Sequence, residues 1–114
     1  MKPKVIRGDV IKEQDFGPIA VKEFFDSEKY TKFSVAKVRI KGEQKFGKDT
    51  QSDMAYYVLD GSGKFYISDN VFDVSKGDLV IIPRNTFYKD EGNLTLLALA
   101  VPRFDRTKRV RLEK

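Results

Sequence analysis

The chain has 114 residues, of which 40% are apolar and 12% aromatic, a composition that suits one globular domain and excludes a disordered segment. It contains neither cysteine nor histidine. Disulfides, thiolate metal sites, cysteine nucleophiles and reactions that rely on imidazole are therefore excluded. No apolar run approaches the roughly 18 residues of a membrane helix, and the N-terminal residues lack the apolar run of a signal peptide. We expect a cytoplasmic protein that does not bind membranes.

The net charge of +5 is concentrated at the C-terminus. Residues 103–114 hold six Lys or Arg against two acidic residues, so the other 102 residues carry only +1. A dedicated nucleic-acid-binding protein shows a basic face across its fold, and stacking aromatics do not accompany this tail. We therefore do not expect nucleic acid as a partner. Val110 and Leu112 alternate with Arg109 and Arg111, which favours a last strand or a solvated end over a polyanion-binding tail.

Short runs rich in Val, Ile, Phe and Tyr, separated by Gly, Asp and Asn, predict an all-β fold. In residues 33–41, Ala36, Val38 and Ile40 alternate with basic residues, the period of a half-buried strand. Further strands are expected at 54–59, 64–67, 71–74, 79–82 and 94–101, with hairpin turns at 60–63, 68–70 and 75–78. Residues 20–30 are the only stretch with some helical character. This spacing of strands is typical of a sandwich or barrel.

Two segments resemble the paired motifs of the cupin superfamily. The first family motif is a Gly, five residues, His-x-His, three or four residues, Glu, six residues and Gly. This chain has Gly42, Lys48, Thr50, Met54 and Gly61 at those positions. The second family motif is a Gly, five residues, Pro, x, Gly, two residues and His. This chain matches it at Gly77 and Pro83, and has Asn85 and Tyr88 at the positions of the second Gly and the His.

The resemblance implies an all-β double-stranded β-helix, a jelly-roll barrel with a ligand cavity at one mouth. We expect one domain over residues 1–114, with the barrel core at about 33–102. Residues 1–32 would be a packing or dimer segment, and residues 103–114 a basic tail.

The resemblance also places the family's four metal ligands at Lys48, Thr50, Met54 and Tyr88. A lysine ammonium repels a cation, and methionine suits only soft Cu(I). We therefore expect neither a metal site nor another cofactor, and no inherited metal-dependent chemistry. Asp53 is one residue from the Glu position, and a one-residue offset in a strand points its side chain to the opposite face.

The matched spacing predicts that four side chains face the cavity: Lys48, Thr50, Met54 and Tyr88. By strand alternation Tyr56 and Val58 share the face of Met54, and Thr86 and Asp90 share that of Tyr88. One interpretation is a metal-free cupin that binds a small anionic or polyhydroxylated metabolite as a sensor or accessory protein, with Lys48 supplying charge. The alternative interpretation is a barrel filled by Met54 and the tyrosines, with Lys48 reaching out to water.

Two other classes of function remain open. A cofactor-free isomerase or lyase acting on a sugar or small oxyacid would use Tyr88 with Lys48 or Asp90 for proton transfer. An interaction module would act through the basic tail and an outward face bearing Phe33, Val35, Tyr57 and Tyr66. The resemblance implies pairing through that face, so we expect a homodimer. Otherwise the N-terminal segment, with Phe16, Ile19, Phe24 and Phe25, folds back over the same face.

Overall fold

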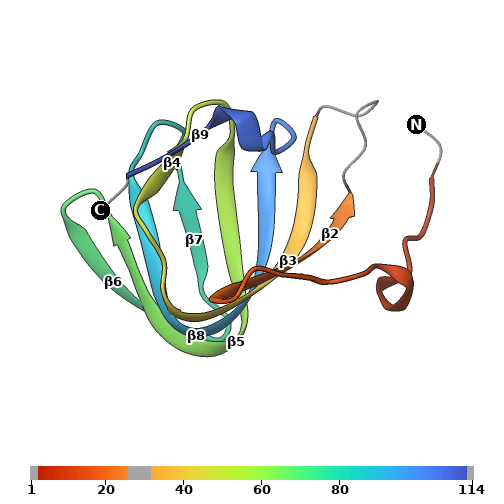
Figure 1. Cartoon of the computed structure of the whole chain (residues 1–114), viewed down its shortest axis with the longest axis horizontal. Helices are drawn as coiled ribbons and strands as arrows, with labels where there is room; N and C mark the ends of the chain where they lie inside the picture. The colour runs from red at the N-terminus through yellow and green to blue at the C-terminus, as the bar shows by residue number, and fades with distance from the viewer. Residues whose placement is uncertain (1–2, 26–31, 113–114) are drawn as a thin grey trace.

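Nine strands in the described part of the chain, residues 3–25 and 32–112 of this computed structural model, join into one curled sheet (Figure 1). In chain order the elements are η1 (Gly8–Val10), β1 (Gln14–Asp15), β2 (Ile19–Phe25), β3 (Ser34–Glu43), β4 (Gly47–Asp49), β5 (Asp53–Ile67), β6 (Asn70–Ser75), β7 (Leu79–Ile82), β8 (Tyr88–Val101), η2 (Arg106–Lys108) and β9 (Arg109–Arg111). Every pairing between strands is antiparallel. The all-β prediction is confirmed.

Three long strands form the wall of the barrel. β8 lies between β3 and β5, and β5 pairs in addition with β6 along its second half and with β7 along its first half. β4 pairs with β9 and, at Gly47, with the start of β8. Figure 1 shows β3, β8 and β5 curving into a bowl, with the short strands β4 and β9 at its upper end.

The interior is filled by side chains that alternate along these strands. In β5, Met54, Tyr56 and Val58 are buried, whereas Tyr57 and Leu59 between and beyond them are exposed. The largest fully buried side chains are Phe65, Ile40, Ile82, Leu94 and Leu96. Burial of each such side chain stabilises the fold by roughly 1.5–3 kcal/mol relative to exposure, so the interior is the main source of stability.

Two sequence predictions about local structure are wrong. The stretch with helical character is in part strand β2, because pairing with β3 places Ile19 and Val21 beside Ile40 and Val38 against the interior. The remainder of that stretch, residues 26–31, lies outside the described residues. The predicted hairpin turn at 60–63 is instead a bend inside the continuous strand β5.

The N-terminal segment does not fold over the whole outer face of the barrel. β2 extends the sheet beside β3, and the segment before it reaches β2, where Lys22 Nζ donates to the carbonyl oxygen of Gly8 at 3.1 Å. Phe16 remains 54% exposed. Within the described residues, no helix is long and apolar enough to cross a membrane.

Candidate functional site in the barrel interior

Two tyrosines meet inside the barrel, one from β5 and one from β8. The hydroxyl oxygens of Tyr56 and Tyr88 are 2.5 Å apart, and their ring centroids are separated by 5.9 Å. The two residues are only 8% and 2% exposed. A tyrosine hydroxyl can donate one hydrogen bond and accept others, so the bond between the two phenols leaves one of their two O–H donors available to a ligand.

Arg109 joins the tyrosine pair from the C-terminal strand β9. It lies opposite Asp49 in the β4–β9 pairing, so the two side chains are on the same face of the sheet. Arg109 Nη1 donates to the Tyr88 hydroxyl at 3.1 Å, and the guanidinium carbon is 5.0 Å from the centre of the Tyr88 ring. An arginine can only donate, so the Tyr88 oxygen is the acceptor of this bond.

Asp90 follows two residues after Tyr88 and is therefore on the same inward face of β8. It is 7% exposed. Burial raises the pKa of its carboxyl to about 6, although the nearby Arg109 charge lowers it. A carboxyl group with this pKa exchanges its proton close to neutral pH, which suits acid–base chemistry.

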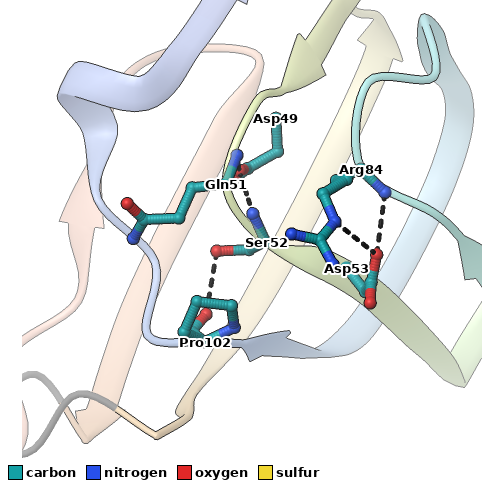
Figure 2. A network of polar contacts seen from close by, with 6 residues as sticks. All are labelled: Asp49, Gln51, Ser52, Asp53, Arg84 and Pro102. Carbon is teal, nitrogen blue, oxygen red and sulfur yellow. Dashed lines mark hydrogen bonds and ion pairs between the residues drawn. The ribbon is translucent and has the colours of Figure 1, made fainter.

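Asp49 supplies a second buried carboxylate, held by the hydrogen bonds drawn in Figure 2. Its Oδ1 accepts from the backbone amides of Gln51 and Ser52, at 2.8 Å and 2.6 Å, and the Ser52 hydroxyl donates to the Pro102 carbonyl at 2.8 Å. These bonds fix the turn between β4 and β5. The other oxygen, Asp49 Oδ2, is buried and has no hydrogen-bond partner, although the residue is only 2% exposed. A buried carboxylate oxygen without a donor is costly and is a natural acceptor for a ligand.

The phenols are protonated at neutral pH. Burial raises the pKa of Tyr56 well above its ordinary value. Burial also raises the pKa of Tyr88, against the opposing effect of Arg109 and of the hydrogen bonds it receives. Among the described residues, those that bring charge to this cluster are thus Arg109, with its guanidinium, and Asp49 and Asp90, with their carboxyls.

The structure places part of the predicted site in the interior. Met54, Tyr56, Val58, Tyr88 and Asp90 are buried, which confirms their predicted inward direction. The role of these residues in binding stays a prediction.

The expectation that Lys48 and Thr50 face the interior is wrong. In β4, Gly47 and Asp49 are buried, so Lys48 between them points to the other face, where its Nζ lies 4.8 Å from the centre of the Phe87 ring. Thr50 is exposed, and its hydroxyl donates to the Lys108 carbonyl. Asp53 points away from the interior as predicted, and its Oδ1 accepts from the Arg84 amide at 2.9 Å (Figure 2).

The positions that the cupin resemblance gives to metal ligands do not fit a metal in this chain. Two of the four, Lys48 and Thr50, point out of the interior. Among the residues that the structure describes, no group of three or more His, Cys, Asp or Glu side chains could hold a metal ion.

Solved structures with the same architecture are numerous. Streptomyces Pac13 with uridine is 18% identical to this chain, and the match covers 98% of this chain and 92% of Pac13 with a TM-score of 0.87. This chain has a cupin fold. KdgF from Halomonas sp. is also 18% identical, with a TM-score of 0.80 over 93% of this chain and 99% of KdgF. A protein from Planctomyces limnophilus gives 18% identity and a TM-score of 0.87 over 96% of each chain.

These structural likenesses show the fold and nothing further about this chain. Pac13 is described as a nucleoside dehydratase, but an identity below one-fifth shows only that this chain shares its architecture. No family model matches the chain, and no curated protein matches it significantly.

Sequence reasoning missed two members of the interior cluster, Asp49 and Arg109. The motif spacing predicts that Lys48 and Thr50, on either side of Asp49, face the interior. The alternation of Arg109 with Val110 favours a last strand or a solvated end, but it does not show that the Arg109 side chain enters the interior. That strand is confirmed as β9.

Proposed function

We propose that this cupin binds a small, neutral, hydroxyl-rich molecule in its barrel, such as a sugar or a nucleoside. The observation that carries the proposal is the buried polar cluster of Tyr56, Tyr88, Asp90, Asp49 and Arg109. A barrel that is merely filled would hold apolar side chains there, because buried polar groups lower stability unless they are all paired. Asp49 Oδ2 lacks a partner.

The charges of the cluster favour a neutral ligand over an anionic one. Lys48, the cation expected to attract an anion, lies on the other face of β4. Arg109 is opposed by Asp49 and by Asp90, whose carboxyl is mostly ionised above its pKa of about 6. A ligand hydroxyl would donate to Asp49 Oδ2 and Asp90, and a ligand oxygen would accept from Arg109. That Pac13 has been solved with uridine, a neutral and hydroxyl-rich molecule, supports this ligand class.

Calorimetric titration with uridine and D-ribose, each compared with its 5′-phosphate, tests the proposal. The neutral compounds should bind more tightly than the phosphorylated ones. The Tyr88→Phe variant should bind the neutral compounds about tenfold more weakly, because the phenol hydroxyl contributes about 1–1.5 kcal/mol through its hydrogen bonds. Tyr57→Phe is the matched control, since Tyr57 is in β5, on the outer face of the barrel wall, and is 43% exposed. Tighter binding of the phosphates, or no binding of any probe, would contradict the proposal.

A second candidate function is elimination of water from such a ligand, favoured by the pKa of Asp90. The Asp90 carboxylate would remove a proton from a carbon next to a carbonyl, and the Arg109 guanidinium would stabilise the resulting enolate oxygen. The electron pair then expels the β-hydroxyl, which takes a proton from the Tyr88 phenol and leaves as water. Neither a redox change nor a cofactor is needed.

Solvent exchange separates binding from catalysis. With a carbonyl-bearing sugar in deuterated water, the wild type should incorporate deuterium at the acidic carbon, and Asp90→Asn should lose this exchange by about 100-fold or more while still binding. If exchange persists in Asp90→Asn, Asp90 is not the base. If the wild type shows no deuterium exchange, elimination of water is ruled out and the binding proposal is unaffected.

A further inference from the structure

The polar cluster inside the barrel is closed to solvent on most sides. Four of its members are buried, with exposed fractions of 8% for Tyr56, 2% for Tyr88, 7% for Asp90 and 2% for Asp49. Arg109 is the member that is half-buried. A sugar or a nucleoside therefore reaches the tyrosine hydroxyls only if part of the wall moves, and the cluster meets solvent where β9 supplies Arg109.

β9 is weakly attached to the rest of the barrel. Within the described part of the chain, it has three residues and pairs with β4 alone, and β4 also has three residues. The wall strands β3, β5 and β8 have 10, 15 and 14 residues. Neither β9 nor the short helix η2 before it contains a buried residue, and Val110 is 43% exposed. Because burial is the main source of stability, β9 can detach at little cost, and such segments open locally before the rest of a fold.

The contacts of β9 fasten it to the cluster itself. The Thr50 amide donates to the Lys108 carbonyl at 3.0 Å, next to the β4–β9 pairing. From β9, Arg109 Nη1 donates to the Tyr88 hydroxyl at 3.1 Å. When β9 detaches, the guanidinium leaves with it, so the interior gains the space of a long side chain. A guanidinium carries five N–H donors, so on its return it can bond both Tyr88 and an entered molecule.

We propose that β9 is the gate of the barrel, detaching from β4 to admit the ligand and closing over it with Arg109. The inference rests on the proposed function, because it takes the interior as the binding site. Figure 1 shows β9 and β4 at the upper end of the bowl that β3, β8 and β5 form. Asp49 stays in place on β4 when β9 moves, since the backbone amides of Gln51 and Ser52 hold its Oδ1. Its unpartnered Oδ2 is then available to an entering hydroxyl.

A reversible disulfide between β4 and β9 tests the gate, and the chain suits this test because it has no cysteine of its own. Lys48 and Val110 are directly opposed in the β4–β9 pairing, on the face turned away from the cluster. Directly opposed residues of antiparallel strands have Cα atoms about 4.5–5.5 Å apart, which a disulfide can span. The double variant Lys48→Cys/Val110→Cys can therefore be compared with itself, oxidised and reduced.

Oxidation should slow both the association and the dissociation of uridine by at least about tenfold, as measured by NMR exchange, because the ligand passes the gate in both directions. The Kd should change by less than about threefold, since the gate is closed both with and without ligand. The matched control is Lys64→Cys/Asp73→Cys, which joins an equally opposed pair on β5 and β6, neither of which pairs with β9. Its oxidation should change neither rate.

Hydrogen exchange of the wild type tests the opening without a variant or a ligand. The amides of Thr50 and Leu112 donate to the carbonyls of Lys108 and Phe46, at 3.0 Å and 2.9 Å, where β4 meets the C-terminal residues. Detachment of β9 exposes both amides. They should exchange at least about 100-fold faster than the amides paired between β3 and β8, which need a larger opening.

The inference and the proposed function fail in different ways. Exchange of the Thr50 and Leu112 amides as slow as that of the β3–β8 amides would overturn the gate, whether or not a ligand binds. An oxidised β4–β9 variant that binds uridine at the rate of its reduced form would also overturn it, as would a control slowed by the same factor. If the wild type binds neither uridine nor D-ribose, the proposed function is wrong, and the hydrogen exchange alone decides whether β9 opens.

Discussion

Replacement of Gly61 by alanine is expected to lower the free energy of unfolding by at least about 4 kcal/mol. A loss of this size is a large part of the total stability of an ordinary domain. Gly61 has a φ of +86°, a conformation that residues with a Cβ rarely adopt, and a Cβ there would lie 2.0 Å from the carbonyl oxygen of Asn93. The obstacle is backbone of the paired strand β8, which cannot move aside without breaking the sheet. This is where β5 bends.

Two other glycines separate the two causes of this loss. A Cβ at Gly63 would lie 2.2 Å from the Glu91 carbonyl oxygen, so Gly63→Ala tests the close approach of the strands. Gly42 has a φ of +83° but no atom within 4 Å of such a Cβ, so Gly42→Ala tests backbone conformation and should cost about 1–2 kcal/mol. Urea unfolding should rank the losses as Gly61, Gly63 and then Gly42. Equal losses for Gly63→Ala and Gly42→Ala would show that the close approach does not matter.

This bend shows what the sequence could predict about the fold and where local reasoning failed. The spacing around Gly61 supported the cupin resemblance and hence the fold, which the structure confirms. Read as local turn chemistry, residues 60–63 predicted a hairpin, because Gly and Asp are typical of one. The strand continues because both of its halves pair with β8, from Asp53 to Ile67, and that long-range pairing determines the path of the chain.

The candidate site was predictable only where strand alternation is long enough to be unambiguous. Tyr56 in β5 and Tyr88 and Asp90 in β8 belong to strands of 15 and 14 residues, and their inward direction was correct. β4 has three residues. Which face of β4 turns inward depends on its pairing with β9. Next to that pairing, the backbone carbonyl of Lys108 accepts a hydrogen bond from the hydroxyl of Thr50, which lies 58 residues earlier in the chain. Neither Asp49 nor Arg109 could be placed without that pairing.

Asp90→Asn is expected to raise the free energy of unfolding by about 2 kcal/mol at pH 7.5 and to change it little at pH 4. Burial raises the pKa of Asp90 from 3.8 to about 6. Below about pH 4 the carboxyl is protonated in both the folded and the unfolded chain. Between about pH 4 and 6 the unfolded chain loses this proton first, so wild-type stability falls as pH rises. Above about pH 6 the full cost of the buried charge, up to about 3 kcal/mol, is present.

Asparagine keeps the shape of Asp90 without the charge, so the stability difference between variant and wild type should grow between pH 4 and 7.5, as followed by urea unfolding. Asp73→Asn is the control, since the Asp73 side chain is 84% exposed and bears no burial cost. It should not stabilise the protein at pH 7.5. A pH-independent effect of Asp90→Asn would show that the carboxyl is not held at a raised pKa. A buried carboxylate that lowers stability at neutral pH has no role in holding this barrel together. Such a group is typical of a binding or catalytic site.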